Sequence, residues 1–123
     1  YLVIGNGNLL LLQKRTKNDI WRNMYEFPII EADRFLSVRE LQKHLAWKSL
    51  FQNTKTGILG KPILSIQKLT HQKINAAFYR VSIAHFSELA QAHNYLIAVE
   101  AKKINNFALP KIIDWYFQNK PLY

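Results

Sequence analysis

The chain has 123 residues, the usual size of one domain, and 49% of them are apolar, which is ample for a packed core. No apolar run approaches the length of a membrane span, and the absence of cysteine excludes disulfides, thiolate zinc sites and iron–sulfur ligation within the chain. Seventeen Lys and Arg against eight Asp and Glu give a net charge of +9, with no acidic residue between Glu40 and Glu88. This charge favours nucleic acid as the partner, and we expect a cytoplasmic protein with no membrane partner.

The N-terminal segment predicts a β-hairpin. Residues 1–4 and 9–15 are rich in strand formers and flank Gly5–Asn8, where an Asn-Gly pair supplies the positive φ angles of a tight turn. A short extended segment is expected at Glu26–Ile30, and Pro28 places it at a sheet edge or strand end.

A helix is predicted after residue 36. Ser37 and Glu40 have the spacing of a capping box, in which each side chain satisfies a free backbone amide at the helix start. The apolar face of this helix is expected to hold Val38, Leu41 and Leu45. Residues 48–61, which contain two glycines, are expected to form a loop.

The second half predicts strands and a closing helix. Two strands, 63–69 and 74–83, flank the polar break Thr70–Lys73, and residues 95–99 read as a further strand or as the start of a helix. Pro110 opens a last helix with an apolar stripe. The expected fold is therefore α+β, or mixed α/β, with helices covering a largely antiparallel or mixed sheet and a single domain over residues 1–123.

The segments at residues 9–15 with 21–28, at 69–71 and at 108–110 together resemble the C-terminal, Nudix-like domain of MutY-type adenine DNA glycosylases. Residues 9–15 followed by Trp21–Pro28 resemble its strand and Leu-Trp-Glu-Phe-Pro signature, although Met24 and Tyr25 stand in place of Leu and Trp. Leu69-Thr70-His71 resembles its Phe-Ser-His loop. Ala108–Pro110, ahead of the last helix, resembles its closing segment, so the resemblance spans nearly the whole chain.

The resemblance implies a role in base-excision repair of DNA. That family removes adenine mispaired with 8-oxoguanine; its catalytic domain, which carries an iron–sulfur cluster, is N-terminal, and its Nudix-like domain reads the oxidised guanine. The chain is then expected to be a C-terminal fragment of a longer enzyme, without a cofactor or catalytic centre of its own. The implied partners are double-stranded DNA with an 8-oxoguanine:adenine pair and the N-terminal catalytic domain of the same chain.

A Nudix-like fold also raises the alternative of a nucleotide pyrophosphatase. That activity uses the motif Gly-x5-Glu-x7-Arg-Glu-U-x-Glu-Glu-x-Gly-U, where U is aliphatic, to present glutamates to Mg²⁺. The remnant here is Glu31, seven residues, and Arg39-Glu40-Leu41, with Lys43 and His44 at the two metal-glutamate positions. A cation and an imidazole in these places disfavour hydrolysis. A basic interaction domain that binds protein or RNA is the other alternative.

The lesion has a chemical signature that a short polar loop can read. Oxidation of guanine at C8 places a hydrogen on N7 and a carbonyl oxygen at C8, so a reader needs an acceptor for N7–H and a donor for O8. A hydroxyl group provides both. The resemblance places Thr70 at the reading position, with Leu69 and His71 beside it. Candidate DNA contacts are Lys68, Gln72 and Lys73, and more weakly Lys14 and Arg15 at the hairpin end.

Overall fold

The structure is a computed structural model that describes residues 1–52, 54–68 and 70–120. The elements in chain order are β1 (Leu2–Asn6), β2 (Leu9–Lys14), β3 (Tyr25–Glu26), α1 (Val38–Lys43), α2 (Leu45–Phe51), β4 (Thr56–Lys68), β5 (Lys73–Ile83), α3 (Phe86–Ala92), β6 (Leu96–Glu100), the 3-10 helix η1 (Ala101–Asn106) and α4 (Lys111–Asn119). Among the helices in these ranges, none is both long and apolar enough to cross a membrane.

The sheet is mixed, as the sequence predicts. Its strand order is β3-β2-β1-β5-β4, and β6 pairs with β2. The pairing of β1 with β5 is parallel, and every other pairing is antiparallel. The fold is therefore mixed α/β with helices on a mixed sheet, and this prediction is confirmed.

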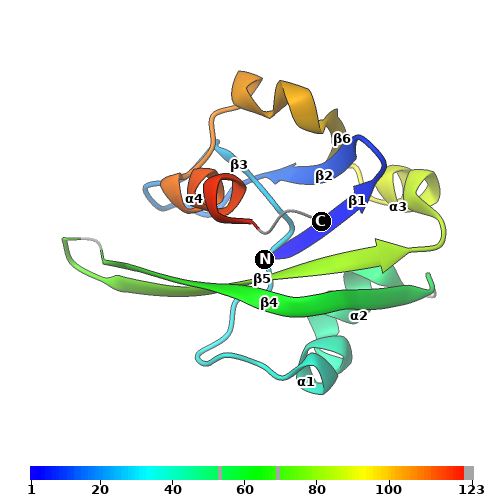
Figure 1. Ribbon diagram of the computed structural model, residues 1–123, viewed down its shortest axis with the longest axis horizontal. Helices are drawn as coiled ribbons and strands as arrows, with labels where there is room; N and C mark the ends of the chain where they lie inside the picture. The colour runs from blue at the N-terminus through cyan, green and yellow to red at the C-terminus, as the bar shows by residue number, and fades with distance from the viewer. Residues whose placement is uncertain (53, 69, 121–123) are drawn as a thin grey trace.

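Two apolar clusters lie on opposite faces of the β4–β5 ribbon. One contains Phe78 of β5 with Ile112 and Tyr116 of α4, and the other contains Val81 of β5 with Leu41 of α1 and Trp47 of α2. Figure 1 shows α4 above the ribbon, α1 and α2 below it, and the loop end of the β4–β5 hairpin extending past the rest of the molecule. The body of the ribbon is held between helices, while its loop end stands clear of them.

Several predicted elements are confirmed. The first hairpin turns through Gly7, whose φ of 59° lies in the left-handed region that glycine adopts without strain. The capping box at the start of α1 has both of its hydrogen bonds, from Glu40 N–H to Ser37 Oγ and from Ser37 N–H to Glu40 Oε1. Residues 96–100 form a strand rather than a helix start, and Pro110 immediately precedes α4.

The loop expected over residues 48–61 is wrong. Helix α2 extends to Phe51, and β4 begins at Thr56. The glycine at position 60 misled the prediction, because it sits at the register shift of β4 between Leu59 and Ile63, where its φ is 66°. A bulge in a long edge strand therefore produced the sequence pattern of a loop.

The apolar face expected for the first helix is also wrong in part. The helix breaks at His44, whose backbone is extended, so Leu45 begins a second helix, and the Leu45 side chain is 80% exposed. Val38 is 42% exposed, and only Leu41 of the three is buried. The helix α3 and the 3-10 helix η1 were not predicted.

Candidate nucleic-acid interface and the adjoining cleft

The β4–β5 hairpin brings together most of the residues predicted to meet DNA. Its ladder ends where Lys68 pairs directly with Lys73, and the connection between them includes Thr70, His71 and Gln72. All five side chains are exposed. Leu69, the third residue predicted to recognise the lesion, lies outside the described residues. The hairpin loop therefore presents a hydroxyl, an imidazole and an amide between two ammonium groups.

The two lysines at the end of the ladder carry like charges on directly opposed positions. Such a pair destabilises a β-ladder relative to a neutral pair. No Asp or Glu occurs between Glu40 and Glu88, so the sequence of both strands provides no carboxylate to offset them. An anion bound between Lys68 and Lys73 would relieve this repulsion. The phosphate groups of a nucleic acid backbone are such anions, and the compact charge of a Lys ammonium group binds them well.

A cleft of about 830 Å³ adjoins the hairpin loop. Gln72 and Lys73 line its outer end, and Asn75 and Tyr79 continue its wall along β5. The opposite side is formed by residues 29–36, which Tyr79 helps to hold by donating a hydrogen bond from its hydroxyl to the Leu36 carbonyl at 3.0 Å. Asn75 and Tyr79 could not be identified as cleft residues from the sequence, because their proximity to residues 29–36 depends on strand pairing between distant parts of the chain.

The inner end of the cleft is organised by Arg15. Its side chain is 6% exposed, and its guanidinium forms ion pairs with Asp19 at 2.7 Å, Glu26 at 3.0 Å and Glu31 at 3.2 Å. It also lies over the Trp21 ring, 5.4 Å from the centroid. Arg15 thus fixes the segment that carries Trp21 at the edge of the cleft. The hydrogen bonds of its guanidinium to Asp19, Glu26 and Glu31 are directed into the protein, and Arg15 is therefore no part of the DNA interface proposed below.

The three carboxyl groups around Arg15 have shifted pKa values. A hydrogen bond from the Arg15 side chain lowers the pKa of Asp19, and one from Lys17 at 2.8 Å lowers the pKa of Glu31. Burial raises the pKa of Glu26, against the opposing effect of hydrogen bonds from Gln13 and Arg15. The cluster is a structural ion-pair network that holds its acids in fixed places.

Lys14, the last predicted DNA contact, lies elsewhere. It is exposed at the end of β2, where it pairs with Tyr25 of β3. The strands β1 and β5 separate β2 from β4 in the sheet. The structure therefore groups Lys68, Thr70, His71, Gln72 and Lys73 at one loop and leaves Lys14 apart from them.

The two glutamates of the pyrophosphatase remnant are each engaged by other groups. Glu31 accepts from Lys17 and Arg15, as described above. Glu40 forms an ion pair with Arg34 and accepts from the Ser37 amide; the Arg34 hydrogen bond is the main reason that its pKa falls to about 2. Both carboxylates are therefore committed to cationic side chains.

The helix that would carry metal ligands also ends too early. After Lys43 the chain turns at His44, whose Nδ1 accepts the Ala46 amide at 3.0 Å and caps α2. Within residues 1–52, 54–68 and 70–120, no three His, Asp or Glu side chains lie where they could hold a metal ion together. The donor set at this position does not fit the Mg²⁺ of a pyrophosphatase, which requires several oxygen ligands in near-octahedral geometry.

The comparison with known families agrees with this fold. A family model described as the NUDIX domain matches residues 1–119. The chain belongs to the NUDIX domain family. A search of curated proteins gives no match. The Nudix-like fold predicted from the sequence is thus confirmed, and the cleft and hairpin loop are features of this NUDIX domain. The narrower resemblance to MutY-type enzymes stays a prediction.

Proposed function

We propose that this NUDIX domain recognises 8-oxoguanine opposite adenine in duplex DNA, and that it supports adenine excision by a catalytic domain elsewhere in the same polypeptide. The observation that carries the proposal is the exposed Thr70–Gln72 loop, which lies between the opposed lysines Lys68 and Lys73 at the projecting end of the hairpin. The resemblance to MutY-type C-terminal domains supports the choice of lesion.

The loop has the groups that lesion reading requires. The Thr70 hydroxyl can accept a hydrogen bond from N7–H of 8-oxoguanine or donate one to its O8. Undamaged guanine has no hydrogen on N7 and no oxygen at C8. Its methyl group, absent from the serine of the resembling family, restricts χ1 and so limits the directions in which the hydroxyl points. His71, also exposed, adds a second donor or acceptor beside it.

The two lysines are proposed to position the domain on the DNA backbone, and they do not read the base sequence. Contacts to phosphate oxygens fix the register of a protein on the duplex, while base contacts give specificity. Lys68 and Lys73 flank the loop, so phosphates bound by them would bring the neighbouring base edge to Thr70. This arrangement separates affinity, which depends on salt, from lesion preference, which depends on the loop.

The domain itself is proposed to be non-catalytic. The commitment of Glu31 and Glu40 to cationic side chains, and the turn at His44, argue against the hydrolytic chemistry of Nudix pyrophosphatases. In the parent enzyme, the glycosidic bond would be cleaved in the separate domain, which would also carry the iron–sulfur cluster.

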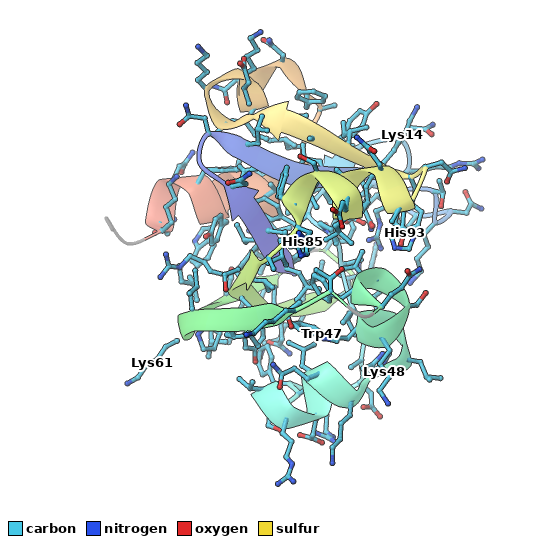
Figure 2. The ribbon with its side chains drawn as sticks, turned by 90° about the vertical axis from the view of Figure 1, so that its right-hand side faces the viewer. Lys14, Trp47, Lys48, Lys61, His85 and His93 are labelled. Carbon is cyan, nitrogen blue, oxygen red and sulfur yellow. The ribbon has the colours of Figure 1, made fainter. Side chains whose placement is uncertain are left out.

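The experiment that tests this assignment measures duplex binding by fluorescence anisotropy over a range of salt concentrations. Replacing both Lys68 and Lys73 by alanine is expected to reduce the slope of log K against log salt by about two units, one for each lost phosphate contact. The matched control replaces Lys48 and Lys102, which are exposed on α2 and η1. Lys48 lies on the side facing the viewer in Figure 2, opposite the hairpin loop of Figure 1.

Both double variants remove two positive charges, so a general effect of net charge would change their slopes equally. An unchanged slope in the Lys68→Ala, Lys73→Ala variant, or an equal change in the control, would show that the hairpin loop is not the DNA interface.

A further inference from the structure

A second surface lies on the same hairpin, nearer its middle, and faces away from α4. Positions 63–68 of β4 alternate in burial: Ser65 is buried, while Leu64 and Ile66 are 57% and 60% exposed. Opposed residues of a ladder share a face, so Leu64 lies beside Ala77 and Ile66 beside Asn75 on β5. These four residues, here called the open face, form a surface of three apolar residues and one amide, and Asn75 and Ala77 also line the cleft.

The open face borders a strand edge with a single neighbour. In the described sheet β4 is the terminal strand and pairs only with β5. Half of the backbone N–H and C=O groups of such a strand point away from its neighbour and can pair with another extended chain. The stretch from Ile63 to Lys68 keeps an unbroken register over six positions, which is the length of a typical strand.

The rest of β4 is less suited to such pairing. The register shift between Leu59 and Ile63 interrupts the ladder there, and Pro62 has no N–H to donate. A pairing partner would therefore dock beside residues 63–68, where the two exposed apolar side chains also lie.

The positive charge around this edge favours an acidic partner. Lys61 and Lys68 bracket the stretch, both are exposed, and Lys61 extends away from the body in Figure 2. Neither β4 nor β5 contains an acidic residue. A second copy of this chain is disfavoured, since it would bring the same lysines and a net charge of +9 to the same edge.

From these observations we infer that the β4 edge binds an extended peptide segment of a partner protein, one with apolar residues at alternate positions and acidic residues at its ends, which adds to the sheet as a further strand. Its backbone pairs with residues 63–68, its alternate apolar side chains cover Leu64 and Ile66, and carboxylates at its ends meet Lys61 and Lys68. Lys68 lies on the same face of β4 as Leu64 and Ile66, so the carboxylate that meets it lies on the same face of the added strand as the apolar side chains. This is the β-augmentation mode, in which backbone pairing gives affinity and alternate side chains give specificity. The inference shares Lys68 with the DNA-binding proposal, while the strand pairing and the contacts of Leu64 and Ile66 belong to the inference alone.

The test uses a fluorescein-labelled peptide, Glu-Glu-Thr-Ile-Thr-Val-Glu-Glu, titrated with the whole chain. Its Ile and Val side chains and one glutamate at each end lie on the same face of an extended strand. Leu64→Ser combined with Ile66→Ser is expected to weaken binding by about tenfold or more, because the apolar cover is lost. Leu45→Ser, which alters an even more exposed leucine on α2, is the matched control and is expected to leave binding unchanged. Circular dichroism and thermal unfolding establish that each variant is folded.

A second arm changes the peptide and leaves the protein as it is. Methylation of alternate backbone amides keeps the side chains and removes the donors needed for strand pairing, so binding is expected to be lost. Equal binding of the methylated peptide, no effect of the Leu64 and Ile66 substitutions, or no binding of the parent peptide would each overturn the inference. It would also be overturned if the two serine substitutions weakened binding of duplex DNA, which would make the open face a nucleic-acid surface.

Discussion

Substitution of Arg15 by glutamine is expected to be among the most destabilising single changes in this domain. The Arg15 side chain is 6% exposed, and its guanidinium makes two contacts with Glu26, at 3.0 and 3.3 Å, while Glu26 is itself 1% exposed. In the variant, Glu26 would keep the hydrogen bond from the Gln13 amide at 3.2 Å and lose its ion pair with Arg15. Leaving a buried charge without its partner costs about 3–5 kcal/mol, a large part of the total stability of a domain.

The pH dependence follows from the raised pKa of Glu26. A carboxyl whose folded pKa lies above its ordinary value binds more protons in the folded state, so its contribution to stability is present at low pH and is lost as pH rises through the folded pKa. Removing Arg15 takes away a group that lowers this pKa, and the pKa of Glu26 rises further. The destabilisation caused by Arg15→Gln is therefore expected to be larger at pH 7.5 than at pH 5.

The assay is urea unfolding followed by tryptophan fluorescence and circular dichroism at these two pH values. Arg34→Gln is the control: it removes an arginine paired with Glu40 at the exposed surface, and little change is expected. Adding Glu26→Gln to Arg15→Gln should recover part of the lost stability, because no buried charge remains. A loss below about 1 kcal/mol, or an equal loss at both pH values, would refute the role assigned to Arg15.

Two further predictions concern the broken helix and the engaged glutamates. His44→Ala should lower the free energy of unfolding by about 1 kcal/mol, since it removes the cap of α2, and His44→Asn should retain most of the stability in the same urea assay. The isolated chain should release neither phosphate nor nucleoside monophosphate from nucleoside diphosphate derivatives in the presence of Mg²⁺, and should excise no adenine from a mispaired duplex. Hydrolysis that disappears in Glu40→Gln would contradict the second prediction.

The features that the sequence predicted correctly are mainly local ones. The turn at Gly7 and the capping box of Ser37 and Glu40 depend on residues within a few positions of one another, so their patterns are visible in the chain. The hairpin loop around Thr70 was likewise visible as a polar break between two runs of strand formers. Its projection from the body became apparent only in the fold.

The features that were missed depend on tertiary contacts or on a residue type that is unusual at its position. Helix α2 begins at a histidine cap, whereas Ser, Thr, Asp and Asn are the residues that normally signal a helix start. Arg15 was predicted to meet phosphate because it follows a strand and is basic. Its burial could not be predicted, because its partners Glu26 and Glu31 are 11 and 16 positions away and reach it only through the sheet and the following segment. The cleft arises from the same non-local packing.

The central claim is that the Thr70–Gln72 loop distinguishes 8-oxoguanine from guanine. The most direct measurement is the ratio of the affinities of this chain for two duplexes that differ only in having 8-oxoguanine or guanine opposite adenine, at fixed salt. Thr70→Ala removes the hydroxyl and should reduce this ratio by about 2- to 13-fold, the equivalent of one neutral hydrogen bond of about 0.5–1.5 kcal/mol. Thr70→Ser should preserve the ratio, and His71→Ala should reduce it if the imidazole contacts the lesion or orders the loop. A ratio that stays the same in Thr70→Ala, in His71→Ala and in the double variant, all folded, would contradict the claim.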